Sequence, residues 1–206
     1  MPRRSPIDPE GYYHVSTRGN FGEPLFQTND EHRLYLELYA KNALRYGWLT
    51  LAWSLMWNHH HFLIKLTNGG LSEGMRGVNH SFSRRMNAVY GRTGTGHLVR
   101  HCFYAGEIQD DNHLAATSRY IDLNAVAAKL CKRPEDWPWS GYRATVGLAH
   151  AEPFHTVSEL HAHLGSTPAK ARSAYRRFVL EGLALPGHVL FPGNGYESVT
   201  PGFGGA

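Results

Sequence analysis

One apolar stretch of the chain contains three consecutive histidines and runs Leu49-Thr50-Leu51-Ala52-Trp53-Ser54-Leu55-Met56-Trp57-Asn58-His59-His60-His61-Phe62-Leu63-Ile64. Its apolar and β-branched residues indicate two strands, at about 48–56 and 60–66, joined tightly at Trp57-Asn58. Side chains two residues apart on a strand point to the same face. His59 and His61 would therefore present two imidazoles side by side, a natural pair of ligands for a divalent metal ion, while His60 points the other way. The residues alone also allow a plainer interpretation, with one histidine capping a turn and the others partly exposed in the core.

Further elements are predicted on both sides of this strand pair. Hydrophobic spacing and turn signals indicate a strand over 12–18, a helix from an N-cap at Asn29-Asp30 to Gly47, a helix over 71–89, a strand over about 99–108, and a helix from Asp111 or Asn112 to about Leu130. The first six elements run strand, helix, strand, strand, helix, strand. This order predicts an α+β fold, with a ferredoxin-like antiparallel four-stranded sheet and helices packed on one face.

The chain has 206 residues, which suits one domain with an extension. We expect a domain over 1–146, a helical extension over 147–185 that is split near Thr167-Pro168, and a flexible Gly/Pro-rich tail over 186–206. The sequence is 42% hydrophobic, enough for a proper core, and has no apolar run of membrane-span length. The N-terminus lacks the apolar segment of a signal peptide, so a cytoplasmic protein is expected.

The charge balance is mildly basic, because the net charge is +4 with neutral histidines. That excess is compatible with a nucleic-acid partner, and several arginines are candidate phosphate contacts because their forked guanidinium groups suit phosphate oxygens. These candidates are Arg18, Arg76, Arg84 and Arg85. A charged run of this kind can also be no more than a solvated face. The two cysteines are too few for a disulfide framework or a thiolate zinc site.

A pair of histidines needs a third ligand, and the helix predicted near 113–130 offers one. Tyr120 and Asn124 are four residues apart, so they lie one above the other on that helix and can bring a phenolic hydroxyl and an amide oxygen to the same place. Considered without the histidines, the same pair could be a half-buried tyrosine and a surface asparagine.

Several motifs together resemble a known family. The run Asn58-His59-His60-His61-Phe62-Leu63-Ile64 resembles the metal-binding strand of HUH single-strand nucleases. Other runs resemble the single-tyrosine transposases, specifically the REP-associated tyrosine transposases, and the likeness covers about residues 10–146. They are Tyr13-His14-Val15, Arg18-Gly19-Asn20, Met75-Arg76 with Asn79, Arg119-Tyr120-Ile121-Asp122-Leu123-Asn124-Ala125-Val126-Ala127-Ala128, and Arg133-Pro134-Glu135-Asp136-Trp137-Pro138-Trp139-Ser140-Gly141-Tyr142.

The resemblance implies a role for each matching residue. His59, His61 and Asn124 would bind a divalent ion, Mg²⁺ or Mn²⁺, and Tyr120 would be the nucleophile that forms a 5′-phosphotyrosine link to DNA. The implied activity is a metal-dependent single-stranded DNA endonuclease and strand transferase, a transposase acting on DNA next to hairpins of the REP type. The implied partner is single-stranded or hairpin DNA, and the protein would be a monomer or a homodimer.

The chain also departs from the family pattern. His60 stands where an apolar residue is usual, so it either lies as a core histidine under the helices that cover the sheet or disturbs the register of the metal ligands. Two other functions stay open: a hairpin-binding protein that has lost cleavage, and a small metal-dependent hydrolase that uses water instead of Tyr120. Two histidines would also permit a zinc site in vitro.

Overall fold

The computed structural model describes residues 6–20, 23–92, 98–99, 103–164 and 167–184. Four strands form one sheet in the order β2-β3-β1-β4, and every neighbouring pair is antiparallel. The strands are β1 (Tyr12–Arg18), β2 (Leu49–Leu55), β3 (His59–Lys65) and β4 (Tyr104–Glu107). The predicted α+β fold with a four-stranded antiparallel sheet is confirmed, and β3 begins one residue earlier than its sequence pattern indicated.

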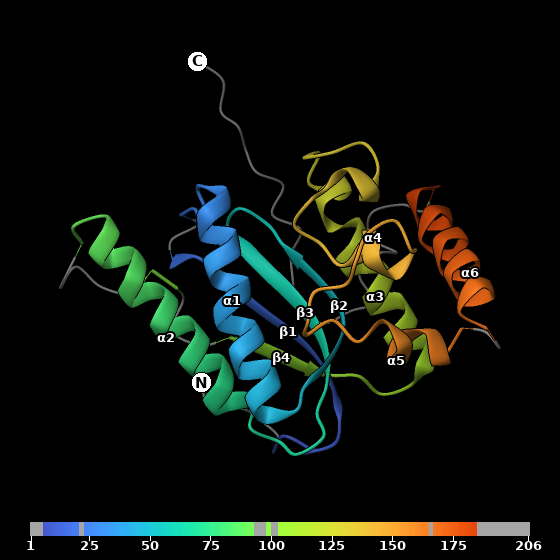
Figure 1. The fold of residues 1–206 in the computed structure, drawn as a ribbon, viewed down its shortest axis with the longest axis horizontal. Coiled ribbons are helices and arrows are strands. Elements are labelled where there is room, and N and C mark those ends of the chain that lie inside the picture. The colour runs from blue at the N-terminus through green and yellow to red at the C-terminus, as the bar shows by residue number, and fades with distance from the viewer. Residues whose placement is uncertain (1–5, 21–22, 93–97, 100–102, 165–166, 185–206) are drawn as a thin grey trace.

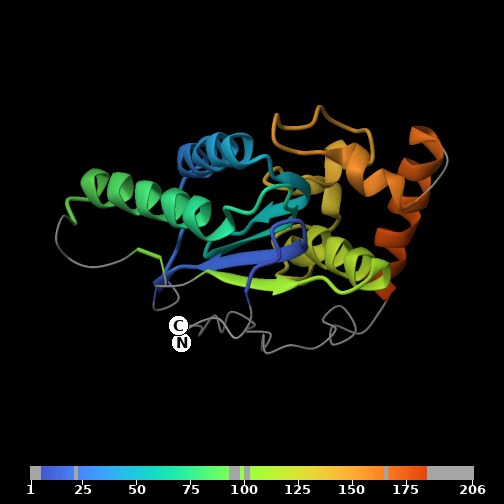
Figure 2. The same cartoon turned by 90° about the horizontal axis from the view of Figure 1, so that it is seen from below.

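Two long helices cover one face of this sheet, as Figures 1 and 2 show. They are α1 (Asn29–Tyr46) and α2 (Leu71–Val89). Their apolar sides enclose a core with the inward residues of β1 and β3, including Val15, Phe62 and Ile64, all fully buried. The helices predicted up to Gly47 and over 71–89 are therefore confirmed, and their buried residues follow helical spacing.

The opposite face is covered over β2 and β3 by α3 (Asp111–Ala127). Leu114 and Ile121 of α3 belong to a second core, which also contains Leu51 and Leu63 of the sheet. Because side chains alternate along β3, Leu63 shares its face with His59 and His61. The helix α3 therefore lies over the same face of the sheet as the two histidines.

Three predicted boundaries are corrected by the structure. Thr28, and not Asn29 or Asp30, is the N-cap of α1: its backbone is extended and its hydroxyl accepts a 3.3 Å hydrogen bond from the Glu31 amide. The strand predicted over 99–108 is only four residues long, with an isolated bridge between Val99 and Gly19, and residues 100–102 lie outside the described ranges. The helix α3 ends at Ala127 instead of Leu130, because Lys129 adopts a left-handed backbone.

The C-terminal extension packs beside β2 and α3. It contains the short helix α5 (Val157–Ala162), the longer helix α6 (Pro168–Glu181) and the 3₁₀ helix η3 (Gly182–Ala184). Two short elements lie between α3 and this extension: the 3₁₀ helix η2 (Pro134–Asp136) and the helix α4 (Tyr142–Thr145). The break predicted near Thr167-Pro168 coincides with the start of α6, where Thr167 is the N-cap. The tail predicted over 186–206 lies outside the described residues.

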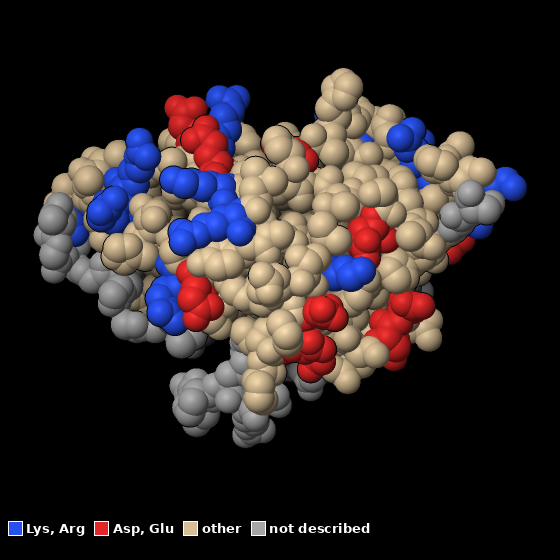
Figure 3. Space-filling view, turned by 60° about the horizontal axis from the view of Figure 1, so that its bottom comes forward, with Lys and Arg blue, Asp and Glu red and all other residues tan. Residues whose placement is uncertain are grey.

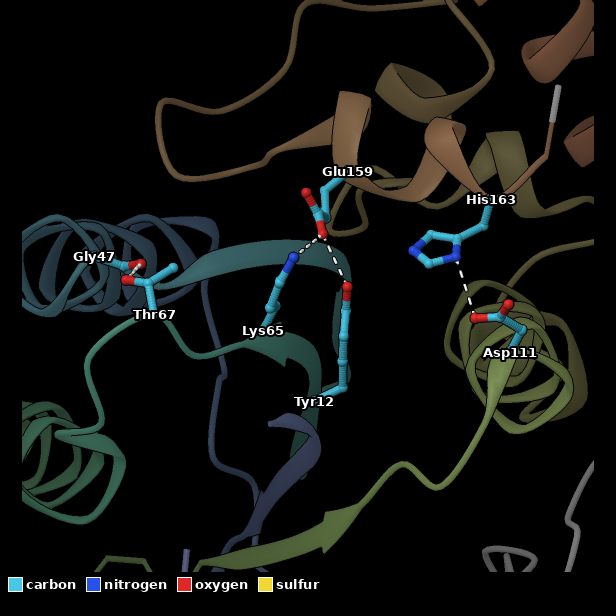
Figure 4. Close-up of polar contacts among 7 residues, drawn as sticks. All are labelled: Tyr12, Gly47, Lys65, Thr67, Asp111, Glu159 and His163. Carbon is cyan, nitrogen blue, oxygen red and sulfur yellow. Dashed lines mark hydrogen bonds and ion pairs between the residues drawn. The ribbon is translucent and has the colours of Figure 1, made fainter. Parts of the chain in front are cut away.

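Polar contacts fasten α5 to the sheet and to α3 (Figure 4). Lys65 of β3 forms an ion pair of 2.5 Å with Glu159, and the Tyr12 hydroxyl of β1 donates a 2.9 Å hydrogen bond to the same carboxylate oxygen. His163, just after α5, lies 3.2 Å from Asp111 in the first turn of α3. None of the helices described in the structure is long and apolar enough to cross a membrane.

Candidate active site

The three consecutive histidines of β3 divide between the two faces of the sheet. His60 points toward α1, is fully buried, and has its Nε2 atom 2.6 Å from the Tyr35 hydroxyl. Tyr35 gives its own proton to Asn79 Oδ1 at 2.9 Å, so His60 Nε2 donates to Tyr35. Asn79 in turn donates to Thr17 Oγ1 of β1 at 3.2 Å. His60 is therefore a core histidine in a polar network beneath the helices, and the alternation of His59 and His61 is undisturbed.

His59 and His61 point to the other face, toward α3, and their ring centroids are 4.9 Å apart. His59 Nδ1 lies 2.6 Å from Asn58 Oδ1, and His59 Nε2 lies 3.2 Å from Asn124 Oδ1. His61 Nε2 lies 3.3 Å from the Tyr120 hydroxyl. The structure thus brings together all four residues that the resemblance placed at the site, within a single chain.

The helix α3 presents Tyr120 and Asn124 to the sheet because they are one turn apart on the side that faces β3. The helix begins at Asp111, and the preceding residue Asp110 is its N-cap, whose carboxylate accepts a 2.8 Å hydrogen bond from the His113 amide. Asn124 is 8% exposed, so its amide is directed into the protein and not to solvent. The plainer interpretation of this pair, with Asn124 on the surface, does not hold.

A third imidazole contacts the site from β1. His14 Nε2 lies 2.9 Å from His61 Nδ1, and the two ring centroids are 5.0 Å apart. The edges of the Tyr120 and Tyr104 rings also approach the His14 ring, with centroids 5.7 Å and 5.9 Å away. His61 is therefore held at both ring nitrogens, by His14 on one side and Tyr120 on the other.

Burial sets the charge of these groups. It lowers the pKa of both His14 and His59 to about 4, with the Arg18 guanidinium adding to the effect at His59, and it lowers the pKa of His61 well below the usual range. Burial raises the pKa of Tyr120 to about 12, although the Asn124 amide and the Arg18 charge oppose this shift. At neutral pH the imidazoles are neutral and able to bind a metal, and the phenol keeps its proton.

The donor set can be compared with the needs of a divalent metal ion. Asn58 Oδ1 is a carbonyl oxygen and can only accept, so His59 Nδ1 donates to it and His59 Nε2 keeps a bare lone pair. That lone pair faces the Asn124 carbonyl oxygen, another acceptor, and a cation between the two atoms would satisfy both. Within the described ranges no three His, Cys, Asp or Glu side chains could hold an ion together. An ion here would depend on the Asn124 amide as a third ligand, and because imidazole is a borderline ligand for Mg²⁺, which prefers oxygen, the site would be a modest one.

The four candidate DNA-binding arginines separate into two groups. Arg18 is half-buried at the end of β1 and pairs in register with His59, so it lies beside the site. Arg76, Arg84 and Arg85 are exposed on α2, which covers the opposite face of the sheet. Figure 3 shows Lys and Arg side chains gathered on the left of the view, on the side of the molecule where α1 and α2 lie.

Two residues that contact the site, His14 and Asn58, were present in the recognised motifs without an assigned role. Asn58 directly precedes His59, so its proximity could have been expected. His14, Ser16 and Arg18 share one face of β1 by alternation, but the contact of His14 with His61 depends on the β1–β3 register, in which Ser16 is opposite His61. That register cannot be read from one strand alone.

Comparison with known proteins agrees with this architecture. The family model described as "Transposase IS200 like" matches residues 9–124, which is more than half of the chain. A solved structure described as "Structure of the REP associates tyrosine transposase bound to a REP hairpin" superposes with a TM-score of 0.59 at 18% identity, covering 75% of this chain and 88% of that one. No curated protein matches the chain significantly. The fold is therefore that of the REP-associated transposase structure, and the chain belongs to the IS200-like transposase family.

Proposed function

We propose that this transposase is a metal-dependent single-stranded DNA endonuclease and strand transferase that cuts DNA beside REP-like hairpins through a covalent tyrosine intermediate. One observation carries the proposal. A phenol, two neutral imidazoles and an amide oxygen from β3 and α3 converge at one place, with the Tyr120 hydroxyl 3.3 Å from His61 Nε2 and the Asn124 oxygen 3.2 Å from His59 Nε2.

Tyr120 is the nucleophile of the proposed reaction. Its oxygen attacks the phosphorus of a phosphodiester, a bond forms between that oxygen and phosphorus, and the bond from phosphorus to the 3′-oxygen breaks. The phenol gives up its proton, and the leaving oxygen gains one to become a free 3′-hydroxyl, while the 5′-phosphate stays on Tyr120. Because one phosphate ester replaces another, a 3′-hydroxyl of a second strand can reverse the step and join new ends.

The surrounding residues make this attack feasible. A phenol with a pKa near 12 is a poor nucleophile at neutral pH, and the positive charge of Arg18 favours its ionised form. A Mg²⁺ or Mn²⁺ ion held by His59, His61 and Asn124 would neutralise phosphate charge and help fix the in-line geometry. The 3.3 Å contact of the Tyr120 hydroxyl with His61 Nε2 within one chain supports an arrangement in which one copy supplies both the nucleophile and the metal ligands.

Hairpin DNA is the proposed partner, because the solved structure with this fold is described as bound to a REP hairpin. Arg18 would contact phosphates next to the cut. Arg76, Arg84 and Arg85 would contact the more distant part of the DNA that reaches α2. The activity would take place in the cytoplasm, where the protein would meet its DNA partner.

The test is incubation with end-labelled hairpin oligonucleotides carrying single-stranded flanks, with Mn²⁺ or Mg²⁺, read on a denaturing gel. A protein-linked band is expected with the native chain. Tyr120→Phe should bind the hairpin equally well and give no band, because it lacks only the attacking oxygen. Tyr46→Phe, which alters a tyrosine of α1 across the sheet, is the matched control and should give the band.

Each other function predicts a different result. A hairpin-binding protein without cleavage would retard the DNA on a native gel and give no adduct on the denaturing gel, for the native chain and for Tyr120→Phe alike. A hydrolase that uses water would cut the DNA without any protein-linked band and would tolerate Tyr120→Phe. Either outcome overturns the proposed mechanism.

A further inference from the structure

His14 lies outside the residues assigned to chemistry, yet its Nε2 atom is closer to His61 Nδ1, at 2.9 Å, than the Tyr120 hydroxyl is to His61 Nε2, at 3.3 Å. The 2.9 Å separation of His14 Nε2 and His61 Nδ1 is a hydrogen-bond distance, so one of these two nitrogens carries the proton and the other accepts it. His14 is half-buried on β1, and its ring is bordered by Tyr104 and Tyr120. The direction of this one hydrogen bond decides which nitrogen of His61 can act at the site.

Two arrangements are possible, and they have opposite consequences. If His14 donates, His61 Nδ1 accepts, and the single proton of the His61 ring must lie on Nε2. That N–H would then point at the Tyr120 oxygen, and His61 could not offer a lone pair there. If His14 accepts, His61 carries its proton on Nδ1, and its Nε2 lone pair faces Tyr120 and the space where an ion would be held.

His59, the other histidine of the proposed metal site, indicates which ring nitrogen carries the proton. Its Nδ1 donates to Asn58 Oδ1 at 2.6 Å, and its Nε2 lone pair faces Asn124. A histidine that binds a metal commonly donates its second ring nitrogen to a fixed acceptor, which sets both tautomer and ring orientation. Asn58 plays that part for His59, and His14 has the matching position at His61.

We propose that His14 is a positioning residue, which accepts a hydrogen bond from His61 Nδ1 and so keeps the Nε2 atom of His61 free to bind a divalent ion. This inference rests on the proposed function, because it presumes that His61 is a metal ligand. It gives a residue of β1 a role in a site whose proposed nucleophile and metal ligands lie on β3 and α3, namely control of the His61 tautomer.

The first test uses the native chain without metal. Long-range ¹⁵N–¹H NMR of the imidazole rings distinguishes a protonated from a bare ring nitrogen, and His61→Ala identifies which signals belong to His61. We expect His61 in the Nδ1-protonated form. A spectrum in which His61 Nε2 carries the proton overturns the proposal, whatever the activity of the protein.

The second test compares two substitutions of His14. His14→Gln can place an amide oxygen near the position of Nε2 and should keep the His61 tautomer and the Mn²⁺ affinity close to native. His14→Leu offers no acceptor, and we expect it to mix the His61 tautomers and to weaken Mn²⁺ binding by roughly 10–100-fold in calorimetry. A role in packing alone would not separate these variants in this way. His80→Leu, at an exposed histidine of α2, is the matched control and should bind Mn²⁺ like the native chain.

Failure of the inference can be told apart from failure of the proposed function. If His61→Ala leaves Mn²⁺ affinity unchanged, the proposed metal site is wrong. If His61→Ala abolishes binding but His14→Leu and His14→Gln both bind as the native chain does, only the role of His14 is wrong. If His14→Leu does not fold, the tautomer of the native protein still decides the question.

Discussion

The Tyr175 hydroxyl of α6 donates a 2.6 Å hydrogen bond to Asp122 Oδ2 of α3, and both side chains are buried. Asp122 lies between Tyr120 and Asn124 on the same helix. One residue before Tyr120, the Arg119 guanidinium lies 4.3 Å from the centre of the Phe178 ring of α6. The C-terminal extension thus packs against α3, so the position of Tyr120, the proposed nucleophile, depends on residues far from the histidines in sequence.

Replacing Tyr175 should destabilise the fold in a pH-dependent way. Burial raises the pKa of Asp122 to about 7, and the bond from Tyr175 opposes that rise, so Tyr175→Phe should raise the pKa of Asp122 further. Because the pKa of Asp122 is higher in the folded than in the unfolded state, the free energy of unfolding falls as pH rises from about 4 through the folded-state pKa of Asp122. We expect Tyr175→Phe to lower the free energy of unfolding, measured with urea, by about 1–3 kcal/mol, with a larger loss at pH 8 than at pH 5.

Asp122→Asn tests whether the pH dependence comes from the charge of Asp122, because it removes that charge and keeps a side chain of nearly the same shape beside Tyr175. The amide cannot ionise, so the pH dependence of the Tyr175→Phe effect should disappear when both substitutions are combined. An equal loss for Tyr175→Phe at pH 5 and pH 8 would show that ionisation of Asp122 plays no part.

Acid should destabilise the metal-free protein through its buried histidines. The pKa of His14 and that of His59 are both lowered to about 4 in the fold. Such groups contribute stability above their unfolded pKa of about 6.5, and this stability is lost as pH falls toward 4. Urea unfolding should show a decline over that range, at most about 1.4 kcal/mol per pH unit for each histidine. His14→Gln, which cannot take up a proton, should make the decline shallower; an identical slope would contradict the assignment.

His60→Leu should leave DNA cleavage intact. The Tyr35 hydroxyl keeps its bond to Asn79, and the substitution removes a buried nitrogen, His60 Nδ1, that has no hydrogen-bond partner among the residues that the structure describes. We expect adduct formation at the native rate and a change in unfolding free energy within about 1.5 kcal/mol, as for swaps of similar volume. The comparison is His61→Ala, which should abolish the adduct. Loss of the adduct in His60→Leu would mean that His60, and not its neighbours, faces the site.

The arginines should differ in what they contribute. Arg18→Ala removes a positive charge beside Tyr120, so it should slow adduct formation even with saturating hairpin DNA. The double change Arg84→Ala and Arg85→Ala should leave that saturated rate unchanged. It should instead weaken hairpin binding and lower the slope of log affinity against log salt by about 1 for each phosphate that the variant no longer neutralises. Filter binding at several salt concentrations measures this slope, and an unchanged slope would show that the DNA does not reach α2.

Periodic patterns made much of this site predictable. Two histidines separated by one residue must share a face on any strand, and Tyr120 and Asn124 must share a side of any helix. Contacts across the sheet were harder to predict, because His14 meets His61 only through the register of β1 and β3. The spacing of α2 shows that Arg84 and Arg85 are exposed, but it does not show which face of the sheet the helix covers. The sequence does not determine the N-cap of α1, because three neighbouring residues, Thr28, Asn29 and Asp30, are all good caps.

Because His60 and the pair His59 and His61 point to opposite faces of the sheet, the register of β3 determines which imidazoles face α3. Shifting the strand by one residue, as a single insertion in the Trp57-Asn58 turn could do, would exchange its two faces. Only His60 would then look toward the tyrosine, while two imidazoles would be forced among the aromatic rings beneath α1. A protein shifted in this way would present one imidazole on the face of Tyr120 in place of the two that the proposed metal site uses, so that site depends on the length of the Trp57-Asn58 turn as well as on its side chains.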